Sequence, residues 1–209
     1  MTALAGLSEA AKKLEDRSLR LSVTVPGAMD VSGVADTKNA RADLTMRSEQ
    51  NGEHRELRLL LVGTDFYLQI AAGVPGLAPG VWWHVDASAV PADSVLNPHK
   101  IVDTRTFLGG MVTAEKVGAG SYQGTLDKET FSAGGKVAPA SPGPAAEQVP
   151  FTARVDEQGR LSELVIETGA TGGPVRARYS DFGAPVTVEA PAPAKVIEMP
   201  AQMRDGLLR

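Results

Sequence analysis

The fold is decided by the stretch Val175-Arg-Ala-Arg-Tyr-Ser-Asp-Phe182, which runs through Gly183-Ala-Pro185 into Val186-Thr-Val-Glu-Ala-Pro191. Its first part alternates apolar and polar residues, which predicts a strand with one apolar and one wet face. Glycine tolerates unusual dihedral angles and proline cannot donate to a sheet ladder, so residues 183–185 predict a bulge or sharp bend. We therefore expect two strands joined at a corner, near the end of a strongly curved antiparallel sheet.

The composition is that of an ordinary globular protein. The chain has 209 residues, of which 43% are hydrophobic and 22% charged, and this length can form one domain without a disulfide or metal. We expect a single domain over residues 1–209, with a Pro/Ala linker at 190–194 before a short C-terminal segment. The apolar runs are too short to span a bilayer. A net charge of -4 offers phosphates no basic field, which argues against nucleic acid as a partner.

The chain contains no cysteine, which removes disulfides, thiolate nucleophiles and zinc-thiolate sites without fixing the compartment. The N-terminal Met1-Thr-Ala-Leu4 has neither the charged region nor the apolar region of an export signal. The chain is therefore either a cytosolic protein or a mature domain whose export signal has been removed, and composition leaves both open.

The period of the apolar residues predicts the order of the elements. Three- and four-residue spacing predicts a helix over residues 3–16 with Thr2 as its N-cap, and a second helix is predicted over 97–108. Asn51-Gly52 is a strong hairpin signal. The alternation predicts about ten short strands. The stretches that precede Val175 are 19–25, 29–35, 41–47, 54–62, 66–70, 81–86, 111–117, 121–126, 149–156 and 161–167.

Because the strands are consecutive, we expect them to pair antiparallel. The predicted fold class is α+β, with a strongly curved antiparallel β-sheet, or half-barrel, wrapped around central helices and enclosing an apolar cavity. A large sandwich without internal helices is the alternative arrangement.

No catalytic motif stands out, and we expect a protein that is not an enzyme and has no catalytic residue, metal ligand or cofactor. The histidines, His54, His84 and His99, lie in three different elements. His84 and Asp86 would share a strand face, but a solvent-facing polar pair explains them better than two ligands of a metal site. Asp181-Phe-Gly183 matches a kinase triplet without the accompanying kinase motifs, so we interpret it as a strand bend.

The candidate binding residues form a surface rather than a motif. Trp82 and Trp83 would point to opposite faces of one strand, which favours one core and one rim tryptophan over a gate for an apolar ligand. Other apolar residues would form one concave surface, which is either simply the core or the lining of a pocket for an apolar ligand. The residues of this surface are Leu57, Leu59, Leu61, Phe66, Leu68, Ile70, Ile101, Val102 and Leu108.

Several runs of the chain match a known pattern. The C-terminal half contains Val149-Pro-Phe-Thr-Ala-Arg-Val-Asp-Glu-Gln-Gly-Arg-Leu161 and Tyr179-Ser-Asp-Phe-Gly-Ala-Pro-Val-Thr-Val-Glu-Ala-Pro191. The chain resembles the LppX/LprA/LprF/LprG family of actinobacterial cell-envelope lipoproteins over nearly its whole length. The matching runs of the N-terminal half are Asp65-Phe-Tyr-Leu68, Trp83-His-Val-Asp86, Glu115-Lys-Val-Gly118 and Tyr122-Gln-Gly-Thr125.

The resemblance implies a half-barrel related to the LolA lipoprotein carrier and the RseB sensor, with a hydrophobic cavity for the acyl chains of lipids or glycolipids. It implies lipid transport or chaperoning in the periplasm-like space outside the cytoplasmic membrane, with a membrane lipid exporter as a possible partner. Family members carry a signal peptide and a lipid-modified cysteine. This chain shows neither, and we expect that both have been trimmed. The alternative is an RseB-like sensor or scaffold that binds a protein partner.

Overall fold

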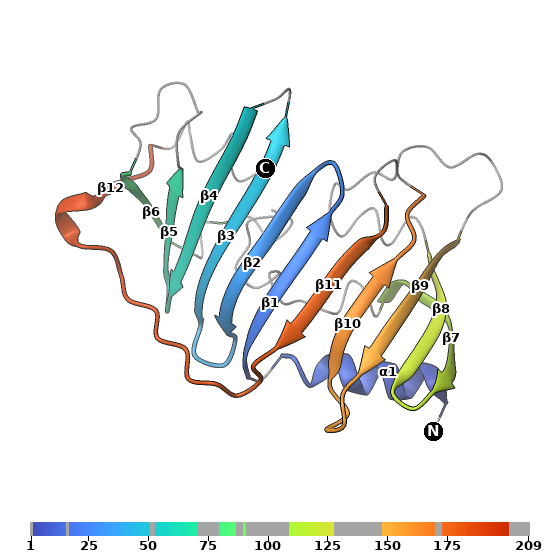
Figure 1. Cartoon of the computed structure of the whole chain (residues 1–209). Helices are drawn as coiled ribbons and strands as arrows, with labels where there is room; N and C mark the ends of the chain where they lie inside the picture. The colour runs from blue at the N-terminus through green and yellow to red at the C-terminus, as the bar shows by residue number, and fades with distance from the viewer. Residues whose placement is uncertain are drawn as a thin grey trace.

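The computed structural model describes residues 2–15, 17–50, 53–70, 80–86, 90, 109–127, 148–169 and 173–200. In this part of the chain, twelve strands form one sheet in the order β12-β6-β5-β4-β3-β2-β1-β11-β10-β9-β8-β7 (Figure 1). Every neighbouring pair is antiparallel except β12 with β6, which is parallel. The predicted α+β fold with a long, curled antiparallel sheet is therefore confirmed.

The strands lie close to their predicted positions, because alternating apolar residues mark them clearly. β3 and β4 pair antiparallel as far as Gln50 and Glu53, as the predicted hairpin requires, and its turn residues Asn51-Gly52 lie outside the described residues. The strands are β1 (Ser18–Val25), β2 (Met29–Asp36), β3 (Arg41–Gln50), β4 (Glu53–Val62), β5 (Asp65–Ile70), β6 (Trp82–Asp86), β7 (Met111–Gly118), β8 (Ser121–Asp127), β9 (Gln148–Val155), β10 (Leu161–Ile166), β11 (Val175–Ser180) and β12 (Val196–Glu198).

One α-helix, α1 (Ala3–Lys12), lies against the β7–β10 end of the sheet in the described part of the chain. The Thr2 hydroxyl accepts a hydrogen bond from the Ala5 amide at 3.3 Å, as its predicted N-cap role requires. The helix is shorter than predicted, because Leu14 N–H donates to the Ala11 carbonyl and tightens the chain into turns while Leu14 stays buried. None of the described helices is long and apolar enough to cross a membrane.

The corner after β11 exists, but the strand predicted beyond it, over residues 186–191, is wrong. Asp181 and Gly183 both have positive φ, at +52° and +79°, and the Gly183 amide donates to the Ser18 carbonyl at 2.8 Å. Arg20 Nε lies 2.8 Å from the Asp181 carboxylate and fixes the turn to β1. Beyond the corner, residues 184–192 make no sheet ladder.

Residues 184–200, which we call the strap, instead run along the sheet to the edge that β6 and β12 form. Figure 1 shows the strap passing the ends of β1 to β4 before a 3₁₀ turn, η3 (Pro193–Lys195), and β12. Val186 and Val188 belong to an apolar cluster with Leu60 and Trp82 on the outer face. Their alternation therefore serves side-chain packing instead of strand pairing, and the four prolines of the strap lack the N–H that a ladder needs. The helix predicted over 97–108 lies outside the described residues.

Gly33, in the middle of β2, allows β2 and β3 to approach each other closely. Its φ is +155°, and a Cβ atom there would lie 2.0 Å from the Asp43 carbonyl oxygen of the neighbouring strand. No L side chain fits this position unless the β2–β3 ladder moves apart.

We expect Gly33→Ala to destabilise the protein by about 3 kcal/mol in urea unfolding, because the methyl group would collide with backbone. Gly109→Ala is the matched control, since nothing lies within 4 Å of its added Cβ. Equal stability of the two variants would show that the close approach of β2 and β3 at Gly33 does not depend on glycine.

Candidate functional site

Rows of apolar side chains cross the inner face of the sheet, which is the face that carries α1. In each row, residues of neighbouring strands stand directly opposite one another, so their side chains contact across the ladder. The first row is Leu21, Gly33, Leu44, Leu59, Leu68 and Trp83, and the second is Leu19, Ala35, Ala42, Leu61, Phe66 and Val85. Every member except Gly33 is buried.

The other half of the inner face is packed under α1. A row from β1 to β8 consists of Val23, Ala177, Leu164, Ala153 and Tyr122. Leu7, Ala11 and Leu14 join the same apolar cluster, so the helix closes this end of the sheet.

The structure places the six predicted surface residues of β4 and β5 together on the inner face. Leu59, Leu61, Phe66 and Leu68 belong to the core cluster and Leu57 packs against it, while Ile70 is buried. The remaining three, Ile101, Val102 and Leu108, lie outside the described residues. The prediction missed further members of the same rows, although alternation within their strands marks them equally well: Leu19, Leu21, Ala35, Ala42, Leu44, Trp83 and Val85.

The two rows contain no ionisable side chain among the described residues. Tyr179, opposite Leu21, stays neutral because burial raises its pKa to about 12. The polar exception is the indole of Trp83, whose buried Nε1 has no hydrogen-bond partner within the described part of the chain. Leaving such a donor unpaired costs about 1 to 3 kcal/mol.

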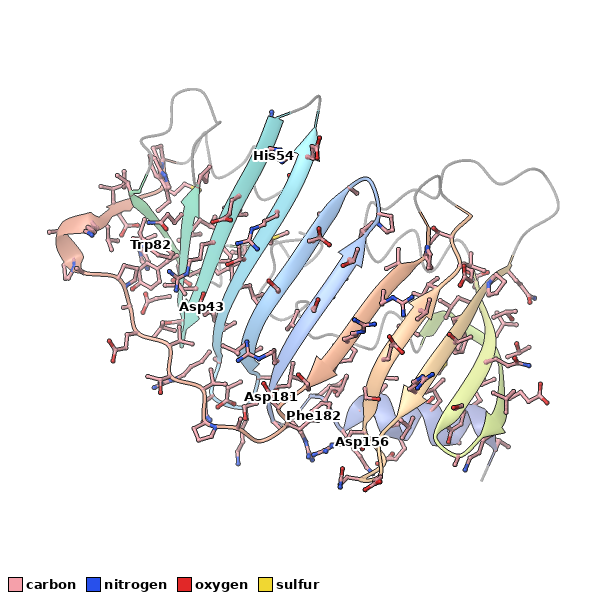
Figure 2. The ribbon with its side chains drawn as sticks, viewed as in Figure 1. Asp43, His54, Trp82, Asp156, Asp181 and Phe182 are labelled. Carbon is pink, nitrogen blue, oxygen red and sulfur yellow. The ribbon has the colours of Figure 1, made fainter. Side chains whose placement is uncertain are left out.

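The adjacent tryptophans lie on opposite faces of β6, as predicted, but neither is a rim residue. Trp83 belongs to the inner cluster and Trp82 to the outer one, and each is only 7% exposed. The strap buries Trp82 through Val188, and the Arg58 guanidinium lies 5.7 Å from the centre of its ring (Figure 2). Sequence reasoning expected one of the two at a rim, and this is wrong because the cover of Trp82 comes from Val188, more than 100 residues further along the chain.

His84 occupies the outer face of β6 and ties together three elements. Its Nε2 lies 2.8 Å from Asp65 Oδ1 on β5, and its Nδ1 lies 2.7 Å from Glu198 Oε1 on β12. Partial burial by itself lowers the pKa of His84, but the hydrogen bonds and charges of the two carboxylates outweigh it and raise the pKa. His84 therefore acts as a clamp that holds β12 and the end of the strap.

Nothing in this clamp indicates catalysis or metal binding. Both ring nitrogens of His84 already face carboxylates, and no group of three acidic or histidine side chains among the described residues could hold a metal ion. His54 is exposed at the far end of β4, with Nδ1 3.9 Å from Glu49. His99 lies outside the described residues.

The Asp-Phe-Gly triplet has the structural role predicted for it. Figure 2 shows Asp181 and Phe182 at the end of β11, near Asp156 of the β9–β10 turn. The Arg160 guanidinium lies 4.3 Å from the centre of the Phe182 ring and donates to Asp156 at 2.6 Å. Burial alone would raise the pKa of Asp156, but the hydrogen bonds from Arg160 outweigh burial and lower it. The triplet thus forms the turn that follows β11.

The outer face carries an open, polar hollow of about 630 Å³ over β1, β2, β9, β10 and β11. At its centre, Glu163 accepts hydrogen bonds from Arg176 at 2.9 Å and Arg178 at 3.0 Å. Burial by itself would raise the pKa of Glu163, but the two arginines outweigh burial and lower it. The polar residues that line the hollow are Arg20, Ser22, Ser32, Arg154, Ser162, Glu163, Arg178 and Ser180. The outer face thus carries polar side chains over β1, β2 and β9 to β11, and the apolar cluster of Trp82 at its β6 end.

An open, curled antiparallel sheet with a helix on its inner face defines the LppX/LolA-like α+β fold. The lipoprotein LppX of Mycobacterium tuberculosis is a solved structure of this kind: it matches with a TM-score of 0.55 over 90% of this chain and 98% of its own length. The two sequences are 14% identical, so the likeness establishes a shared fold. No protein-family profile and no curated protein sequence matches the chain.

The His84 clamp should make stability depend on pH. The protonated ring can donate to Asp65 and Glu198 together, whereas the neutral ring has one N–H. Since the folded-state pKa is raised above 6.5, this stabilisation is complete below about pH 6.5 and is lost as the pH rises through the folded-state pKa. We therefore expect His84→Gln to be less stable than the unaltered chain at pH 6, with a smaller difference at pH 8.

Urea unfolding at both pH values would measure this change. His54→Gln is the control, because His54 is exposed and far from β12. A stability difference for His84→Gln that stays constant with pH would contradict the clamp.

Proposed function

We propose that this chain binds the acyl chains of a lipid or glycolipid on the inner face of its sheet. The observation that carries the proposal is the pair of inner rows, in which side chains from six successive strands form one surface without an ionisable group among the described residues. The LppX-like fold supports the proposal, because its neighbour is a lipoprotein with the same sheet architecture. The proposed lining is the predicted set, Leu57, Leu59, Leu61, Phe66, Leu68, Ile70, Ile101, Val102 and Leu108.

Desolvation supplies the affinity in this proposal, at about 0.8 kcal/mol for each methylene group that leaves water. Small residues on β2 and β3, namely Gly33, Ala35 and Ala42, stand opposite leucines in the rows. A lining of this kind selects for the volume of the chain and makes few directional contacts.

The proposed role is lipid transport or chaperoning in the cell envelope. The domain over residues 1–209 would act as one carrier unit, held near the outer face of the cytoplasmic membrane by a lipid anchor and supplied by a membrane lipid exporter. No catalytic step is needed, since transfer of a lipid between two sites breaks no covalent bond.

Native mass spectrometry tests the proposal directly. The protein is purified gently from a lipid-rich host and then exposed to vesicles that contain diacyl phospholipids. We expect mass additions that correspond to lipid. The bare mass alone, before and after exposure, would overturn the proposal and favour a sensor or scaffold that binds a protein partner.

Leu59→Trp should reduce lipid uptake by at least about tenfold, because the larger ring would occupy volume that the proposal assigns to the acyl chain. Thr45→Trp is the matched control, since Thr45 lies on the neighbouring strand but on the outer face, opposite Arg58. Circular dichroism would establish that both variants fold, and a fluorescent fatty-acyl probe would measure uptake. If both variants bind the probe as the unaltered chain does, the site has been placed on the wrong surface.

A further inference from the structure

The indole N–H of Trp83 is the unusual feature of the inner face. Trp83 is 7% exposed, and its Nε1 is buried without an acceptor among the described residues. Folded proteins pair nearly all their buried polar atoms, so a donor left without a partner indicates a group that is supplied from outside the chain. Phenylalanine would fill the same space without this donor.

The surroundings of the indole determine what this group can be. Trp83 stands opposite Leu68 in the first row and next to Val85 along its own face of β6. Both neighbours are aliphatic and buried. A buried water needs two to four polar partners, and the described side chains beside Trp83 provide only the indole itself. A ligand atom is a better acceptor there than a water molecule.

The row from Trp83 to Leu21 is long enough for an acyl chain. It crosses six strands, which at about 4.8 Å between strands gives roughly 24 Å. An acyl chain of a bilayer lipid covers about half of a 30 Å hydrocarbon core, or roughly 15 Å. An acyl chain that starts at Trp83 can therefore lie along Leu68, Leu59 and Leu44 within the length of the row.

We propose that Trp83 donates a hydrogen bond from Nε1 to the ester carbonyl oxygen of a bound acyl chain, and that the ligands are acyl esters. This inference rests on the proposed lipid-binding function and names its ligand class. An ester carbonyl accepts one hydrogen bond and carries no charge, which suits one neutral donor on an apolar surface. A free fatty acid would bring a carboxylate to a face whose described rows hold no cation, and burying it there is unfavourable. An alkyl ether lacks the carbonyl acceptor.

The test compares Trp83→Phe with the unaltered chain on two probes of equal length, a long-chain methyl ester and the corresponding alkyl methyl ether. Each affinity is measured by displacement of a fluorescent fatty-acyl probe. We expect the unaltered chain to bind the ester about 5- to 10-fold more tightly than the ether. In Trp83→Phe this preference should fall to about onefold, with ether affinity unchanged.

Trp82→Phe is the matched control, because Trp82 has the same side chain on the same strand but lies on the outer face under the strap. It should keep the preference for the ester. A preference that survives in Trp83→Phe, or equal binding of both probes by the unaltered chain, would overturn the inference while leaving lipid binding intact. Failure of both probes to bind would overturn the proposed function itself.

An NMR measurement on the unaltered chain makes the test independent of how Trp83→Phe folds. The two tryptophans give two indole N–H signals, which Trp82→Phe assigns. Ester binding should move the Trp83 signal downfield, whereas ether binding should not, because only the ester supplies an acceptor. Identical shifts of the Trp83 signal with both probes would contradict the hydrogen bond.

Discussion

The register of the antiparallel ladder is the constraint on which the rest of the structure depends. From β6 to β8, each inner residue of one strand stands opposite an inner residue of the next, so the apolar rows continue across the sheet. A slip of one residue at any strand would turn its leucines outward and its arginines inward. The register is therefore held by the burial of whole rows, and Gly33 allows it where the backbone of β3 lies too close for any other side chain.

Different elements cover the two ends of the sheet. At the β7 end, α1 lies on the inner face and adds Leu7, Ala11 and Leu14 to the core. At the β6 end, the strap lies on the outer face, buries Trp82 and adds a short parallel strand whose Glu198 bonds to His84. The strap thus covers the outer face of β4 to β6, while the inner face of these strands carries the two apolar rows.

Alternation predicted most of the sheet from the sequence, because the period of two is local and each strand carries its own signal. The strap shows where this reasoning stops. Val186 and Val188 alternate as strand residues do, but alternation records only that one side of a segment is buried, and here the buried side faces Leu60 and Trp82 without a ladder. The same limit applies to the site. The sequence predicted that Leu57 to Ile70 share one face. It could not predict that Val188 buries Trp82 or that Glu198 bonds to His84, because these residues are distant in the chain.

A diffuse apolar lining and a single hydrogen-bond donor do different work in recognition. In the proposed complex, row contacts with Leu44, Leu59 and Leu68 would be equally good for a chain that lies in either direction, so they would fix volume and leave orientation free. One donor near the end of a row, Trp83 Nε1, would remove this ambiguity, because a carbonyl occurs at only one end of an acyl chain. The polar part of the ligand would then lie at the β6 edge, away from α1. If the ester preference depends on Trp83, orientation of the bound lipid is encoded by this one N–H, and the remaining lining can vary without changing which end of the ligand leaves the site first.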